Sequence, residues 1–447
     1  MKLDKKMIIS ITLTLLIFIS VFIFMVSKCK YGLIIDIEVS ILFTFFAAIL
    51  IFSKDYLNPF IMFFIYSFLG FLDIVFVLFD LRITRFTQSE AIYQQTLLII
   101  ILWFFSFSIG YFFISKVRLK RESISSINII GKIDFNIKGT IVIIFAIMGF
   151  VFFKLVSTAS SVGGLFAAFS TEGYKIFEGQ NYLSMIMAII GVLPVIYLAT
   201  NNKKKALFMT LFVLFFMSLT KRRSLALINS LLPILIYYNY KVKRIKIKYL
   251  LFMTIPIGIY ILYIASMRGI AAGASDTISN GLLSNLVEIT RQIQYGENIP
   301  DMIAALNSGN IVFQGFNYIF NGILTFIPRG IWKNKPLVES AAIVGQMVYG
   351  ANVAGHPVGP YGWAYFCFGY YGVVIFGVLN GVIVRRVFEW VKKKNSIFSY
   401  LLYSLIIVKL IEIFQPESQF KISFMVLVLV CLSFLSKFFK KFNVKFE

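Results

Sequence analysis

Residues 59–79 read PFIMFFIYSFLGFLDIVFVLF, an apolar run interrupted by one charged residue, Asp73. A helix needs roughly 20 apolar residues to cross a bilayer, so this run predicts a membrane span. Similar runs recur along the chain, and about twelve spans are predicted in total. They lie near residues 7–26, 33–52, 59–79, 96–115, 139–157, 182–200, 206–220, 224–240, 250–266, 362–384, 397–414 and 420–436.

The composition excludes an ordinary soluble domain. The chain is 59% hydrophobic and only 14% charged, whereas soluble domains average about 25% charged residues. Its net charge of +23 would indicate a nucleic-acid partner in a soluble protein. Here the basic residues gather in loops on one side of the predicted spans, as cytoplasmic loops do. We therefore expect the lipid bilayer, and no nucleic acid, as a partner.

The positive-inside pattern also predicts the orientation and the domain organisation. Both termini are expected on the cytoplasmic side of a multi-pass membrane protein. Residues 1–266 hold the first nine spans and 267–361 form a large external loop with short helices. Residues 362–447 hold the last three spans and a basic cytoplasmic tail. The expected fold class is an all-α polytopic membrane protein.

The external loop has helical segments of its own. Asp276 is placed to cap a helix over residues 282–293, whose leucines and isoleucines recur at helical spacing. Pro300 is expected to open a second short helix that Gly309 ends. Residues 313–327 are apolar but too few to span, which favours a re-entrant or interfacial element. Polar loops this long are usually functional.

Several cations lie where a bilayer protein does not favour them. Lys221, Arg222 and Arg223 fall between two spans on the predicted external side, against the positive-inside tendency. Arg268 ends a span, and Arg329 lies beside apolar sequence. One interpretation is that these cations anchor the chain at lipid head groups. The other is that they bind a pyrophosphate in an external cavity, because a guanidinium grips two phosphate oxygens at once.

The single histidine, His356, lies in Gly355-His356-Pro357-Val358-Gly359-Pro360, just before a span. A lone histidine is often an interfacial hydrogen-bonding group. Imidazole also exchanges protons near neutral pH, so His356 is a candidate general base. Glu339 is a second candidate base. Both interpretations of His356 stay open from the residues alone.

The stretch Pro328-Arg329-Gly330-Ile331-Trp332-Lys333-Asn334-Lys335-Pro336 resembles the signature of Wzy-type O-antigen and capsule polymerases. As in that family, a Gly-rich external segment and an aromatic, Gly-spaced helix follow it. The resemblance implies transfer of a glycan from undecaprenyl pyrophosphate onto another lipid-linked repeat unit, in a fold like that of metal-independent GT-C glycosyltransferases. It implies no metal or cofactor, and a chain-length regulator protein as a further partner.

The expected site combines the external cations with the candidate bases. A pyrophosphate leaving group needs cationic stabilisation as its negative charge develops. Arg329, His356 and Glu339 are the expected catalytic residues. The expected pyrophosphate-binding residues are Arg222, Arg223, Arg268, Arg291 and Lys335.

Aromatic side chains are expected to contact the glycan. Sugars stack on aromatic faces, although aromatic residues also gather at membrane interfaces for other reasons. The candidates are Trp332, Tyr349, Tyr361 and Trp363.

Three other kinds of membrane protein share some of these features. A glycan-lipid flippase also has about twelve spans, but short external loops are expected for it. An O-antigen ligase uses the same donor with a different acceptor. A metal-dependent glycosyltransferase would need acidic ligands in its first external loop, and the segment before Asp36 and Glu38 is too short to form that loop.

Overall fold

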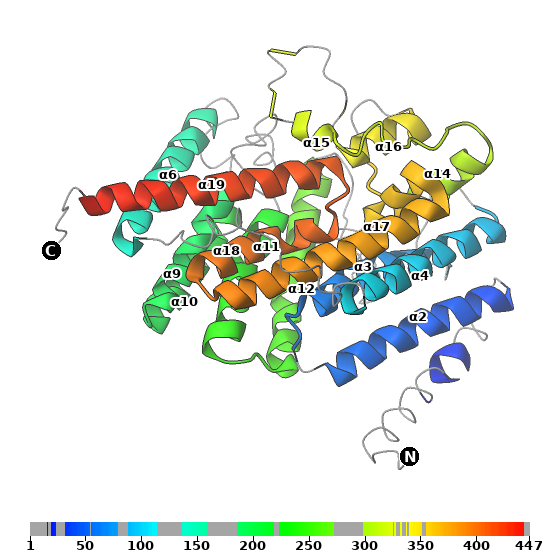
Figure 1. The fold of residues 1–447 in the computed structure, drawn as a ribbon, viewed down its shortest axis with the longest axis horizontal. Helices are drawn as coiled ribbons and strands as arrows, with labels where there is room; N and C mark the ends of the chain where they lie inside the picture. The colour runs from blue at the N-terminus through cyan, green and yellow to red at the C-terminus, as the bar shows by residue number, and fades with distance from the viewer. Residues whose placement is uncertain are drawn as a thin grey trace, which may run out of the picture. The chain divides into compact units, whose positions relative to one another are not determined.

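The computed structural model describes residues 32–53, 55–78, 88–113, 136–159, 186–218, 223–271, 298–324, 339–350 and 355–441, with residues 16, 19–23, 326, 327, 331, 332 and 337 besides. Every regular element within these residues is a helix (Figure 1). The chain divides into two compact units, each built from three separate stretches of sequence. The expected all-α fold is confirmed for the part of the chain that is described.

Unit 1 comprises residues 1–117, 281–386 and 408–420, and unit 2 comprises 118–280, 387–407 and 421–447. Unit 1 contains α2 (Leu33–Phe52), α3 (Pro59–Leu78), α4 (Glu90–Phe112), α14 (Asn298–Asn307), α15 (Asn321–Leu324) and α16 (Ser340–Tyr349). Unit 2 contains α6 (Ile137–Ala159), η4 (Ile189–Gly191), α9 (Val192–Ala199), α10 (Lys203–Ser218), α11 (Arg223–Tyr237), η5 (Tyr238–Val242) and α12 (Ile247–Ala271). Both units share α17 (Gly359–Lys394), α18 (Ile397–Ile411) and α19 (Pro416–Lys441).

The helices fall where the apolar runs predict spans. Each predicted span from 33–52 onward overlaps a helix, whereas most of the predicted span 7–26 lies outside the described residues. Among the described residues, five helices are long and apolar enough to cross a membrane. They are Pro59–Leu78, Glu90–Phe112, Ile137–Lys154, Gly359–Lys394 and Pro416–Ser436.

Aromatic contacts hold α2, α3 and α4 together in unit 1, where the three helices lie side by side (Figure 1). Phe63 of α3 stacks on Phe107 of α4 with ring centroids 3.5 Å apart. Phe46 of α2 stacks on Phe68 of α3 at 3.6 Å. Lipid tails are as apolar as these side chains, so the hydrophobic effect does not draw helices together inside a bilayer. Close van der Waals packing drives their association instead.

Small residues let α17 approach α4 closely. A Cβ on Gly381 would come within 2.2 Å of the Phe107 carbonyl oxygen, and one on Gly377 within 2.7 Å of Ser106 Cβ. From the other side, a Cβ on Gly110 would meet the Val378 carbonyl oxygen at 2.0 Å. The Gly-x-x-x-Gly spacing of 377 and 381 is typical of closely packed membrane helices.

Helix α17 is broken at Phe368 and Gly369, where the sequence predicts one continuous span over 362–384. Gly369 has φ 62°, in the left-handed region that favours glycine. The break is joined to the segment before α15, since the N–H groups of Gln314 and Gly315 donate to the carbonyls of Phe366 (3.1 Å) and Cys367 (2.8 Å). The expected re-entrant character of 313–327 stays a prediction; among the described residues of this segment the helix is the four-residue α15.

In unit 2, η4, α9, α10 and α11 pack against one another. Gly191 lies so close to α11 that a Cβ would meet the Asn229 carbonyl oxygen at 1.8 Å. Beyond α11, Tyr240 stacks on Tyr400 with ring centroids 5.9 Å apart. Lys241 Nζ donates to the Asn395 carbonyl (2.7 Å), which ties the basic segment after α11 to the turn before α18.

Candidate active site

Three contacts within unit 1 position His356. Its ring stacks on Tyr349, with centroids 4.1 Å apart and planes 28° from parallel. Its Nδ1 lies 3.3 Å from Oδ1 of Asn298. Its backbone N–H donates to the carbonyl of Ala341 (2.8 Å). Two of these contacts come from α16 and one from α14, so these two short helices position the histidine.

The Asn298 amide determines which nitrogen of His356 carries a hydrogen. The Asn298 Nδ2 group donates to the carbonyl of Pro357 (3.0 Å), and a carbonyl oxygen can only accept. The nitrogen of the amide must therefore face Pro357, which directs Oδ1 toward His356. Because Oδ1 also only accepts, Nδ1 is the protonated nitrogen and the basic lone pair of neutral His356 is on Nε2.

A buried carboxylate extends this polar cluster. Asp301 is 7% exposed, and its Oδ2 accepts a hydrogen bond from the Tyr349 hydroxyl (2.8 Å). Its Oδ1 accepts from Nε2 of Gln88 (2.6 Å), which lies just before α4. The Tyr349 hydroxyl also lies 3.2 Å from Asn298 Oδ1. We call Gln88, Asn298, Asp301, Tyr349 and His356 the His356 cluster.

The local sequence explains why these side chains meet. Asn298 and Asp301 are three positions apart, which puts both on one side of α14. Tyr349 is the last residue of α16, and Gly350 ends that helix with φ 63° and its N–H bonded to the Gln346 carbonyl (3.1 Å). The short helix expected around Pro300 is confirmed, beginning two residues earlier, at Asn298.

The structure brings two of the expected site residues together, His356 and Tyr349. Glu339 is exposed and lies just before α16, and Trp332 is also exposed. Tyr361 and Trp363 are fully buried in α17. Trp363 Nε1 donates to the Phe414 carbonyl (2.9 Å), so this indole packs inside the unit rather than along a glycan-facing wall.

The side chains of the expected phosphate-binding cations lie outside the described part of the chain. Arg223 and Arg268 lie in α11 and α12, but their side chains are outside the described part. Arg222, Arg291, Arg329 and Lys335 lie outside the described residues altogether, as does the helix expected after Asp276. Their roles stay predictions.

Sequence reasoning missed Gln88, Asn298 and Asp301. A usable signal was present for two of them, because Asn298 and Asp301 flank Pro300 on a helix that the sequence does predict. Gln88 carries no such signal, since its contact with Asp301 joins residues 213 positions apart.

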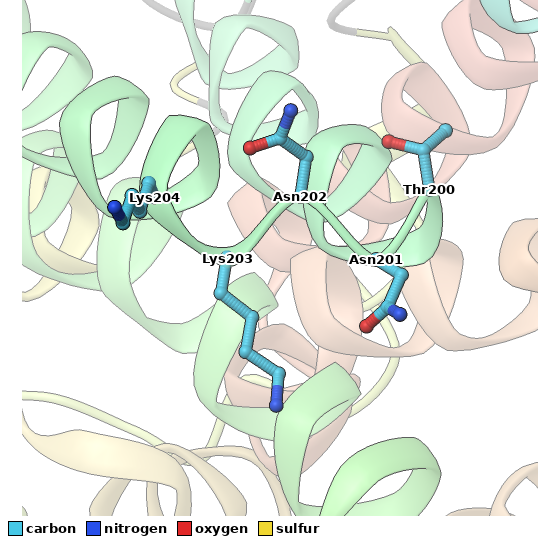
Figure 2. A pocket seen from close by; sticks show the side chains of 5 residues that line it. All are labelled: Thr200, Asn201, Asn202, Lys203 and Lys204. Carbon is cyan, nitrogen blue, oxygen red and sulfur yellow. The ribbon is translucent and has the colours of Figure 1, made fainter.

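A shallow surface pocket lies in unit 2 at the turn between α9 and α10. It is lined by Thr200, Asn201, Asn202, Lys203 and Lys204. Figure 2 shows that the side chains do not converge, with Asn201 and Lys203 pointing to one side of the turn and Thr200 and Asn202 to the other. Asn202 is occupied in capping α10, where its Oδ1 accepts from the Lys205 N–H (3.1 Å). The pocket therefore lacks the focused polar groups of a binding site.

The comparison with protein families decides what kind of chain this is. The family model for O-antigen polymerases matches residues 55–413, which is well over half of the 447 residues. The chain belongs to the O-antigen polymerase family. The suspected family is thereby confirmed, and it supports a repeat-unit polymerase role rather than a flippase. No curated protein matches the chain, and no solved structure matches it either.

Membership agrees with the fold and adds the compartment. The apolar helices and the family together indicate a multi-pass protein of the inner membrane in polysaccharide biosynthesis. The match spans α3 to α18 and so includes the whole His356 cluster. Among the described residues, no group of three histidine, cysteine or acidic side chains is arranged to hold a metal ion.

Proposed function

We propose that this O-antigen polymerase uses His356 as the base that activates the acceptor sugar. The acceptor hydroxyl oxygen would bond to the anomeric carbon of the donor glycan as the carbon–oxygen bond to undecaprenyl pyrophosphate breaks. The hydroxyl proton passes to Nε2 of His356, and the pyrophosphate leaves with the electron pair. The observation that carries this proposal is the Asn298 contact, because it keeps the hydrogen on Nδ1 and the lone pair on Nε2.

The Nε2 atom is covered by surrounding protein. An acceptor hydroxyl therefore reaches Nε2 only after some of the surrounding protein atoms move. Substrate binding commonly causes such movements of loops around an active site. Covering the base also keeps bulk water from competing with the acceptor sugar, and hydrolysis of the activated donor is the reaction that a polymerase must avoid.

The leaving pyrophosphate needs positive charge and no metal in this proposal. Arg329 and Arg268 are the cations that we propose to contact it, supported by Arg222, Arg223, Arg291 and Lys335. What supports this is their chemistry and the family resemblance around Arg329. Glu339 stays a second candidate base, and Trp332 is the exposed aromatic residue that we propose as a glycan contact.

The proposed topology is the one that the charge pattern predicts. About twelve helices span the membrane in a GT-C-like arrangement, both termini are cytoplasmic, and residues 267–361 face outward between the membrane regions 1–266 and 362–447. The substrate is an oligosaccharide linked to undecaprenyl pyrophosphate. A chain-length regulator protein is a proposed further partner.

Complementation of a deletion strain tests the proposal. The surface polysaccharide is separated by gel electrophoresis in cells that carry the wild-type gene, no gene, or His356→Ala. We expect the ladder of long chains to disappear in the last two, while a band with a single repeat unit remains. Loss of every repeat, including that single unit, would indicate an O-antigen ligase instead. A full ladder from His356→Ala would remove His356 from the mechanism.

A further inference from the structure

We infer that Glu417 is a positioning residue for His356, acting through helix α16; the inference rests on the proposed function of His356. Glu417 lies in the first turn of α19. Its Oε2 accepts from the backbone N–H of Ser340 (3.0 Å), and its Oε1 accepts from the Ser340 hydroxyl (2.5 Å). Ser340 is the first residue of α16 and is 1% exposed.

Helix α16 is ten residues long and holds His356 from both of its ends. Near its start, the carbonyl of Ala341, the neighbour of Ser340, accepts from the His356 backbone N–H. At its end, Tyr349 stacks on the imidazole. A shift or rotation of α16 would therefore move the backbone and the ring of His356 together. A residue that holds the start of α16 in place therefore also holds His356 in place.

A carboxylate suits this position better than a neutral acceptor. The residue just before α16, Glu339, makes no capping hydrogen bond with its side chain, so Glu417 supplies the acceptor that the first turn of a helix requires. Two oxygens satisfy two donors of Ser340 at once, and hydrogen bonds to an ionised acceptor are stronger than neutral ones. The negative charge also lies in the first turn of α19 itself, where the helix dipole favours it.

Other contacts keep the first turn of α19 in place against the external loop. Gln419 Nε2 donates to the Ile319 carbonyl (2.7 Å). A Cβ on Gly322 would meet the Pro416 carbonyl oxygen at 2.2 Å, so α15 packs directly on this turn. Phe420 meets Phe326 edge to face, with ring centroids 4.8 Å apart. Glu417 therefore projects from a turn that several contacts hold rigid.

The test uses the fact that His356 is the only histidine in the chain. Diethyl pyrocarbonate reacts with neutral imidazole, and mass spectrometry of the purified full chain gives the rate of modification at His356 as a function of pH. The variants are Glu417→Ala, Glu417→Gln and, as matched control, Gln346→Ala, an exposed position on α16 itself. The polysaccharide ladder of each variant is recorded in the deletion strain.

We expect Glu417→Ala to react roughly tenfold faster at His356, since two hydrogen bonds to a charged acceptor are lost, and to shorten the ladder. Glu417→Gln keeps one acceptor oxygen and should lie between Glu417→Ala and wild type, which a general loss of stability does not predict. Gln346→Ala should match wild type in both measurements.

Glu417→Ala protein that elutes as wild type and reacts at His356 at the wild-type rate would overturn the inference. If Glu417→Ala does not fold, Ser340→Ala decides by the same measurement, because it removes only the hydroxyl contact. The His356→Ala ladder separates the two proposals. A full ladder there defeats the proposed function, while the reactivity of His356 in wild type and Glu417→Ala still tests the positioning role.

Discussion

Asn298 and His356 show how one amide sets the chemistry of its neighbour. The Pro357 carbonyl orients the amide, the amide orients the imidazole, and the basic lone pair comes to lie on Nε2. All three steps follow from which atoms can donate and which can only accept. The same logic yields a measurement that needs no substrate.

We expect His356 to be the Nδ1–H tautomer in its neutral form. Nitrogen chemical shifts of the purified chain labelled with ¹⁵N-histidine check this directly, because the chain has one histidine. Asn298→Ala removes the acceptor and should abolish the preference for Nδ1–H. An Nε2–H signal in the wild-type protein would contradict the assignment.

Asp301 can be tested with a change that keeps its size. Asp301→Asn removes the charge that the Tyr349 hydroxyl and Gln88 face. The loss of a charge-assisted hydrogen bond, about 1.5 kcal/mol, corresponds to roughly a tenfold loss of polymerisation. Amounts of long-chain polysaccharide measure the effect, with Ser308→Ala, an exposed change one residue beyond α14, as the control. Unchanged amounts would make Asp301 a packing residue only.

The arginines that we propose to bind the pyrophosphate carry a separate prediction. Arg329→Ala and Arg268→Ala should abolish long chains while single repeats and membrane insertion persist. Lysine should rescue poorly, because an ammonium does not bind two phosphate oxygens in the planar fork of a guanidinium. Gel analysis of the polysaccharide checks this, and full rescue by lysine would show that a point charge is enough.

For individual residues, the sequence predicted which types of side chain belong to the site better than it predicted which side chains contact one another. His356 and Tyr349 were recognisable as types of residue that suit a glycan-transferring site. The partners Gln88 and Asp301 were not, because hydrogen bonds between residues 213 positions apart depend on how the helices pack. The buried Trp363 illustrates the converse: an aromatic residue near a membrane edge is read equally well as a sugar platform or as core.

At the scale of helices, α4 and α17 approach each other closely because the glycines at their crossing carry no side chains. Gly381→Leu would drive a side chain into the Phe107 carbonyl, and overpacking of this kind costs about 1–3 kcal/mol or more. We expect a clear fall in thermal stability, measured by fluorescence-detected size exclusion after heating.

The matched control for Gly381→Leu is Gly149→Leu in α6. A Cβ at Gly149 meets nothing within 4 Å, so this variant should keep wild-type stability. Equal losses at both positions would mean that leucine is tolerated poorly in any helix of this protein, and that the crossing is not special.

Helix positions were predictable from the sequence, but helix continuity was not. Apolar length sets where a helix forms in a bilayer protein, which is why α2 and α3 match their predicted ranges closely. The break at Gly369 escaped prediction because glycine is frequent in membrane helices and most such glycines stay helical. Only the backbone of 314–315, distant in sequence, makes this one a break.

For the whole molecule, orientation in the membrane is the property that remains to be measured. In a cysteine-free background, Gln346→Cys in α16 should react with an impermeant maleimide in intact cells, because we propose that 267–361 faces outward. Lys204→Cys, in the first turn of α10, should react only after the membrane is opened. The reverse pattern would place His356 on the cytoplasmic side and exclude transfer onto exported lipid-linked glycans.

The organisation into two units was not visible in the sequence. Charge and hydropathy divide the chain into consecutive blocks, whereas each compact unit collects three separate stretches. Periodicity along a chain records which residues face lipid, but it contains no information on which distant helices pair.

The hydrogen bonds between residues 314–315 and the break in α17 have an evolutionary consequence. Gln314 and Gly315 reach Phe366 and Cys367 with main-chain atoms only, so no side chain is needed for the link. The side chain at 314 can therefore change while these hydrogen bonds persist. The neighbouring Phe313 and Phe316 are more constrained, because their rings contact Tyr365 (5.7 Å between centroids) and Phe368 (4.8 Å). A proline at 314 or 315, which lacks the amide hydrogen, is the substitution that such drift has to avoid.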